Sequence, residues 1–208
     1  VRELIAERTI WRREARVGLS TLPYLGSKVA VLGLIVTIQC VVLAGMNWAL
    51  LEMYEFGYSF WALTGVTTLT GLVGMAMGLL MSSIFSSSEA AVGTLPLLLI
   101  PQITFGGLIV KIKEMGALAK GISYLMIVRY SFDATIKAGE ELTRPARYGN
   151  DREAMGIGGF LYDLGLRETS KADDMGLSLS VLCLILFGFL SGFLMFSAWF
   201  TQRSTEGN

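Results

Sequence analysis

Residues 29–51 read VAVLGLIVTIQCVVLAGMNWALL and contain no charged side chain. A helix needs about 20 predominantly apolar residues to cross the hydrocarbon core of a bilayer, and this stretch is long enough. Surface helices of soluble proteins keep a polar face, which this stretch lacks. The sequence therefore predicts a membrane-spanning helix here.

Three later stretches have the same character, at residues 58–81, 90–110 and 176–200. Hydrophobic residues make up 53% of the chain, and the 16% that are charged lie outside all four stretches. Backbone groups cannot stay unpaired in lipid, so stretches of this length without alternating polarity favour helices over barrel strands. We therefore expect an all-α, polytopic membrane protein with four transmembrane helices.

Charge around the first stretch predicts the orientation. Arg12, Arg13 and Arg16 precede it, whereas Glu52 and Glu55 follow it. The positive-inside rule then places the amino end in the cytoplasm, and four crossings return the carboxyl end there. We expect a cytoplasmic segment at 1–27, three transmembrane helices at 28–110, an external subdomain at 111–175, and the last transmembrane helix with a cytoplasmic tail at 176–208.

The external subdomain begins with residues 115–138, which are apolar but too short and too charged to span. This predicts one re-entrant or interfacial helix that ends at Gly139, a typical C-cap residue. Arg129 and Asp133 are spaced i, i+4, so we expect a structural ion pair between them rather than a ligand contact. A second, short amphipathic helix is expected at 152–166.

The chain offers little catalytic chemistry. It has no histidine, and Cys40 and Cys183 lie within two different apolar stretches without metal or redox spacing. We therefore expect no catalytic residue, no metal and no cofactor in this chain. The four stretches also lack the ionisable groups that ion-coupled carriers generally need near the bilayer midplane. Energy for uphill transport would then arrive from another domain.

The third stretch has the most unusual composition. Pro96 and Pro101 each remove a backbone donor and can kink the helix, and Gln102 and Thr104 add polar groups beside that kink. Two interpretations stay open: a helix that lines a pathway with an apolar constriction near its outer end, or a kinked structural helix.

Small residues recur one turn apart in two stretches, at Gly74 and Gly78 and at Gly188 and Gly192. Such pairs let helix backbones approach closely. We expect these glycines to pack inside the domain rather than at a dimer seam.

The amino-terminal segment is rich in both signs of charge and has apolar residues for a contact with the membrane surface. It is interpreted either as a juxtamembrane helix that binds anionic lipid heads or as a docking element that transmits motion from a cytosolic partner.

Several motifs, taken in order, resemble the membrane domain of G-subfamily ABC transporters of the bacterial type. They are Arg2-Glu3-Leu4, Arg12-Arg13-Glu14, Ile100-Pro101-Gln102, the run 105–110 (FGGLIV) and Arg129-Tyr130-Ser131-Phe132. The resemblance implies that the four spans are helices three to six of a six-helix half-transporter. This chain, which starts at Val1, would then be the C-terminal portion of a longer one.

The resemblance also assigns roles to residues. A cytoplasmic coupling helix would contain Glu7, Arg8, Arg12, Arg13 and Glu14. The substrate pathway would be lined by Ile100, Gln102, Ile103 and Phe105, with Leu108 and Ile109 as an apolar plug.

The implied function is the membrane-spanning portion of an ATP-driven exporter of lipid-like or amphipathic substrates in the bacterial inner membrane. ATP and Mg would bind a nucleotide-binding domain in the same parent chain or in a separate subunit, because this sequence shows no Gly-x4-Gly-Lys-Ser/Thr loop. Expected partners are that domain, a second membrane domain as homo- or heterodimer, and membrane lipid, but no nucleic acid. A non-transporting scaffold or assembly subunit is the alternative.

Overall fold

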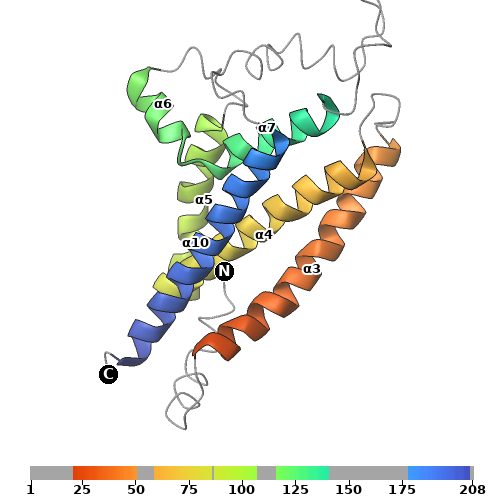
Figure 1. Ribbon diagram of the computed structural model, residues 1–208. Coiled ribbons are helices and arrows are strands. Elements are labelled where there is room, and N and C mark those ends of the chain that lie inside the picture. Colours follow the sequence, from red (N-terminus) through yellow and green to blue (C-terminus); the bar gives the residue numbers. More distant parts are fainter. Residues whose placement is uncertain (1–20, 51–58, 86, 107–115, 141–177, 207–208) are drawn as a thin grey trace, which may run out of the picture.

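The computed structural model describes residues 21–50, 59–85, 87–106, 116–140 and 178–206 (Figure 1). These residues form the helices α3 (Thr21–Leu50), α4 (Phe60–Ile84), α5 (Ser88–Phe105), α6 (Ala117–Ser123), α7 (Ile127–Glu140) and α10 (Leu179–Glu206). Four of the helices, α3, α4, α5 and α10, are long and apolar enough to cross a membrane. The prediction of an all-α polytopic membrane protein with four such helices is confirmed.

The helix boundaries differ from the apolar stretches. α3 already begins at Thr21 and α10 continues to Glu206, because backbone hydrogen bonding extends beyond the part of a helix that lies in lipid. α5 ends at Phe105 rather than at residue 110. Two glycines, which are poor helix formers, follow Phe105 directly. The coupling helix predicted within 1–27 and the amphipathic helix predicted at 152–166 lie outside the described residues.

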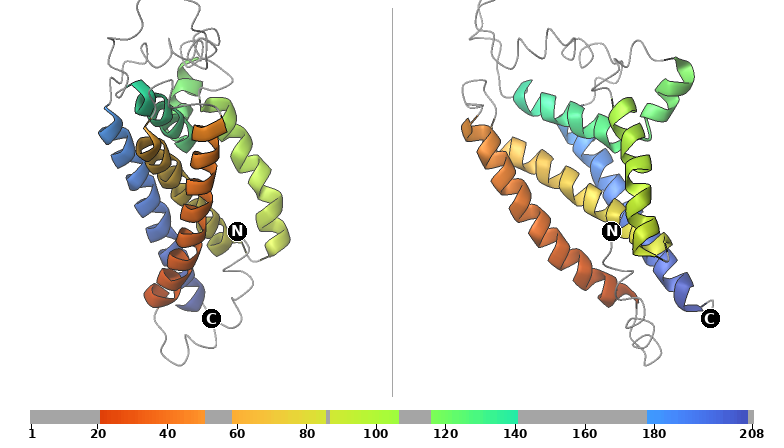
Figure 2. Two further views of the ribbon diagram at one scale, coloured as in Figure 1. Left: turned by 90° about the vertical axis from the view of Figure 1, so that its right-hand side faces the viewer. Right: turned by 180° about the vertical axis from the view of Figure 1, so that it is seen from behind.

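Helix α4 is the centre of the bundle. It lies between α3 and α10 in both views of Figure 2, and 39% of its apolar window is buried, against 17% or less in the other three spans. Small and medium apolar side chains on several sides of α4 make this possible, among them Leu63, Val66, Val73, Ala76 and Leu79.

One apolar core joins α4, α7 and α10. Tyr130, Ala134 and Ala138 of α7 are spaced one turn apart and pack with Val73 of α4 and Leu186 of α10. The buried core residues are Leu182 and Leu186 near the start of α10, and Val66 and Val73 between the start and the middle of α4. Helix α7 therefore lies toward the ends where α4 and α10 begin (Figure 1).

A second core lies at the opposite end of α4. Leu25 of α3 and Leu79 of α4 form its buried part, and Leu194 and Ala198 of α10 pack against them. The start of α3 and the ends of α4 and α10 therefore lie at one end of the bundle, opposite α7.

Helices α3 and α4 are in tight contact at Gly71. A Cβ atom at this position would lie 2.7 Å from Sγ of Cys40 and 2.9 Å from Cγ1 of Val36. By contrast, a Cβ at Gly74, Gly188 or Gly192 would meet nothing within 4 Å. The prediction that these three glycines pack inside the domain is therefore wrong, because spacing alone does not say which side of a helix meets a neighbour.

Candidate functional site

The candidate pathway helix α5 begins with a capped first turn. The hydroxyl of Ser87 accepts a hydrogen bond from the backbone N–H of Ala90 at 3.2 Å, and Glu89 complements the helix dipole. Farther along, Thr104 donates its hydroxyl to the carbonyl of Ile100 at 2.8 Å. The hydroxyl of Thr104, which lies near Pro101 in the sequence, is thus bonded to the backbone of its own helix.

The residues predicted to line the pathway lie on different sides of α5. Ile100 and Ile103 are 62% and 43% exposed, whereas Gln102 is buried and donates from Nε2 to Sδ of Met77 on α4 at 3.2 Å. Phe105 is half-buried at the end of the helix. The structure therefore groups Ile100 with Ile103 and separates Gln102 from them, while residues 108 and 109 lie outside the described residues.

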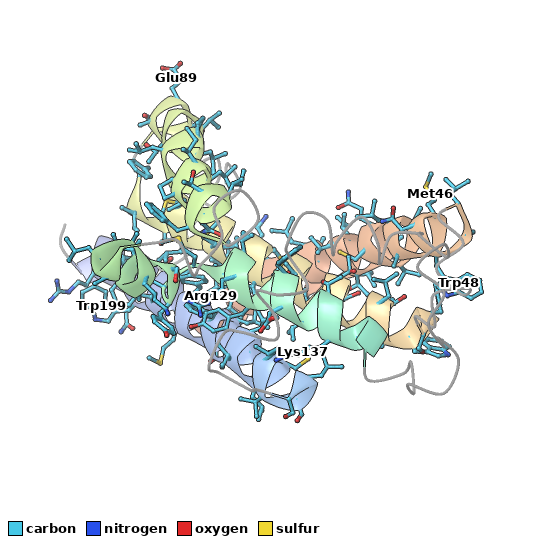
Figure 3. The ribbon with its side chains drawn as sticks, turned by 90° about the horizontal axis from the view of Figure 1, so that it is seen from above. Met46, Trp48, Glu89, Arg129, Lys137 and Trp199 are labelled. Carbon is cyan, nitrogen blue, oxygen red and sulfur yellow. The ribbon has the colours of Figure 1, made fainter. Side chains whose placement is uncertain are left out.

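Helix α5 is joined to α7 by a tight contact at its carboxyl end. A Cβ atom at Gly106 would lie 2.6 Å from the carbonyl of Gln102 and 2.8 Å from Cγ1 of Val128. Seen from above, α5 projects away from the other helices with Glu89 at its far end (Figure 3). The Gly106 contact was not predicted, although the Gly-Gly pair at 106 and 107 is a signal for close backbone approach.

The predicted single helix at 115–138 is wrong, because the chain turns between α6 and α7 at residues 124–126. Arg129 of α7 donates to the hydroxyl of Ser123, and its guanidinium lies 4.3 Å above the ring centroid of Tyr124. The hydroxyl of Tyr130 donates to the carbonyl of Tyr124 at 2.7 Å. Burial raises the pKa of Tyr130, which the Arg129 charge partly opposes, so this donor stays protonated.

The charged residues of α7 make contacts that the sequence did not predict. Asp133 pairs with Lys137 at an N–O distance of 3.6 Å, and the buried Arg129 makes the contacts with Ser123 and Tyr124 given above. Figure 3 labels Arg129 and Lys137 on this helix. The pair between Arg129 and Asp133 stays a prediction. Gly139 lies in the last turn of α7 rather than beyond it, so its prediction as the C-cap is wrong.

A hydrogen bond that was not predicted links α7 to the centre of the bundle. The hydroxyls of Thr70 on α4 and Ser131 on α7 are 2.7 Å apart. Hydroxyl residues within apolar stretches are the sequence signal for such links between helices. Together with the apolar core around Tyr130, this bond fixes α7, which in turn holds the end of α5.

Metal ligation has no support among the described residues, where no group of three or more His, Cys, Asp or Glu side chains could hold an ion. The predicted coupling residues lie within 1–20 and thus outside the described ranges.

Comparison with protein-family models identifies the family of the chain. The model of the ABC-2 type transporter family matches residues 3–138, which include the predicted coupling residues and all helices from α3 to α6, with most of α7. No curated protein matches the chain. Domains of this kind are the permease component of ABC transporters and associate with a nucleotide-binding component. With four described helices long and apolar enough to span a membrane and a match over more than half its length, the chain belongs to the ABC-2 type transporter family and forms part of the membrane domain of an ABC transporter.

Proposed function

We propose that this chain forms the membrane part of an ATP-driven exporter of the G-subfamily type, which moves lipid-like or amphipathic substrates. The observation that carries the proposal is the apolar, exposed side of α5, where Leu97 is 74% and Ile100 is 62% exposed. A hydrocarbon chain passing along this side would meet apolar side chains throughout. The buried amide of Gln102 would act on the other side of α5, by holding the helix against α4.

A complete pathway needs a second membrane domain. Four spans make a small bundle, and α5 projects from it, so a second domain facing α5 would enclose the apolar side between two walls. The second domain is either an identical copy or a different chain. Leu108 and Ile109 would narrow the space between the walls.

The chain would lie in the bacterial inner membrane. ATP hydrolysis would act on it at its cytoplasmic end. The segment with Glu7, Arg8, Arg12, Arg13 and Glu14 immediately precedes α3, so a nucleotide-binding domain that pushes on it would tilt α3 and the helices packed on it. ATP and Mg would be bound by that domain. Two states of the bundle, with the pathway open to one side or the other, are sufficient for transport.

The test is lipid movement by the full-length transporter with its nucleotide-binding domain in proteoliposomes. Ile100→Trp should lower the ATP-dependent translocation of a fluorescent phospholipid about tenfold or more, because steric misfit in an apolar site has effects of this size. The matched control is Ile38→Trp, which changes an isoleucine that is 56% exposed on α3. Helix α5 projects away from α3 (Figure 3).

Equal rates for the two variants would contradict a pathway along α5. Lipid movement driven by an ion gradient without nucleotide would contradict the ATP-driven mechanism. ATP hydrolysis that no lipid or amphipathic compound stimulates, with no movement of any of them, would favour a scaffold or assembly subunit.

A further inference from the structure

An open apolar groove runs between the end of α4 and the middle of α10. It has a volume of about 580 Å³ and is lined by Leu80 of α4 and by α10 residues that include Ile185, Gly188, Gly192 and Phe196. Gly188 and Gly192 leave space where a side chain would otherwise stand, since a Cβ at either position would meet nothing within 4 Å. The volume lies in the range of small-molecule sites, about 300–1,000 Å³.

The lining determines which chemistry fits. Phe189, Phe193 and Phe196 form the wall beside the glycines, and none of the described residues that line the groove is charged. Such a groove suits a hydrocarbon chain. From Ile185 to Phe196 the helix rises about 16 Å, close to the roughly 15 Å of hydrocarbon in one leaflet of a bilayer.

Beyond the groove, the same face of α10 carries a positively charged residue, Arg203. Phe196, Trp199 and Arg203 follow one another at intervals of three and four residues, so they share one side of the helix. The rings of Phe196 and Trp199 are 5.6 Å apart, and the guanidinium carbon of Arg203 lies 4.2 Å above the ring centroid of Trp199. Trp and Arg at the end of a span are typical of the level of lipid headgroups.

The positive charge of Arg203 indicates which kind of lipid headgroup would bind next to the groove. A guanidinium stacked on an aromatic ring keeps its N–H edge in the plane of the group, where it can bind two phosphate oxygens at once. Arg203 is exposed, and it is the basic residue in the last turn of α10. We propose that the groove between α4 and α10 binds one acyl chain of an anionic phospholipid, whose phosphate is held by Arg203.

The test is the affinity of the purified full-length transporter for phosphatidylglycerol and phosphatidylcholine with identical acyl chains, measured by native mass spectrometry. Arg203→Gln should weaken phosphatidylglycerol binding about fivefold, as expected for one basic residue at a membrane surface. Phosphatidylcholine binding should change less, because the trimethylammonium group of choline already offsets the charge of the phosphate that Arg203 would contact. The control is Lys28→Gln, which removes a positive charge from the same end of the domain but from α3.

A second variant tests the groove itself. Gly188→Leu should weaken binding of both lipids about tenfold, which corresponds to roughly two methylene groups displaced from an apolar site. The control is Gly74→Leu, at a glycine that is equally open but does not line the groove. In the unmodified transporter, a phosphatidylglycerol with a photoreactive acyl chain should label residues 185–196 more than the exposed face of α3.

Several results would overturn the proposal. They are an equal effect of Arg203→Gln on both lipids, an effect of Gly188→Leu no larger than that of Gly74→Leu, and labelling spread evenly over α3 and α10. A change in subunit stoichiometry with Gly188→Leu, without any change in lipid binding, would instead assign the groove to a second protein helix.

Discussion

Adding one methyl group at Gly71 should loosen the contact between α3 and α4. The new Cβ would lie 2.7 Å from Sγ of Cys40 and 2.9 Å from Cγ1 of Val36, and both distances are shorter than carbon and sulfur atoms tolerate. Cys40 is buried, and a valine in a helix has one strongly preferred χ1 rotamer. Because neither neighbour moves easily, the helices must separate.

The size of the effect follows from two terms. Overpacking of a tight contact costs about 1–3 kcal/mol. A change from glycine to alanine also alters helix propensity by up to about 1 kcal/mol, and this term is shared by the control Gly74→Ala one turn away. Since a Cβ at Gly74 would meet nothing within 4 Å, Gly71→Ala should be less stable than Gly74→Ala by about 1–3 kcal/mol.

The measurement is the free energy of unfolding in mixed micelles, obtained by titration with a denaturing detergent. A double-mutant cycle adds Val36→Ala, which removes one of the two colliding side chains. The loss caused by Gly71→Ala should be smaller in this background, with a coupling energy of at least about 0.5 kcal/mol. Equal stabilities of the two glycine variants, or the absence of coupling to Val36, would refute the packing of α3 on α4 described above.

Two further perturbations test the position of α7. Gly106→Ala would place a methyl group 2.8 Å from a side chain of α7 and should lower the free energy of unfolding by about 1–3 kcal/mol, whereas Gly93→Ala, inside α5 and with nothing within 4 Å, should not lower it. Thr70→Val removes the 2.7 Å hydrogen bond to Ser131 and should cost about 0.6 kcal/mol. A cycle with Ser131→Ala should recover this value as coupling, and Thr67→Val, whose hydroxyl donates within α4, should show no coupling.

The sequence was sufficient to predict the spans but less accurate about their ends. Residues 29–51 cover most of α3 and residues 58–81 cover most of α4, because a long apolar run in lipid must form a helix to pair its backbone groups. The end of α5 at Phe105 was missed, since the residues after it are apolar but include two glycines. Hydropathy measures solubility in lipid and does not register where a helix stops.

The candidate site was predicted only in part. Charge spacing on one helix predicted a pair between Arg129 and Asp133, which stays a prediction. The contacts of Arg129 with Ser123 and Tyr124 across a turn were not predicted. That turn is not visible in a pattern of apolar residues, because the residues at 124–126 are themselves apolar or aromatic. The turn at 124–126 places Ser123 and Tyr124 beside Arg129, so the contacts of this buried arginine depend on the turn.

By itself, the sequence determined that the described part of this chain is helical and includes four helices long and apolar enough to span a membrane, because the length and apolarity of a segment are local properties. Only the tertiary structure decided that Gly71 rather than Gly74 meets α3, and that Gln102 faces α4 while Ile100 faces outward. The physical reason is that lipid tails are as apolar as leucine, so hydropathy does not distinguish the side of a helix that faces lipid from the side that faces another helix. Shape and hydrogen bonding between helices make that distinction, and they exist only once the bundle has formed.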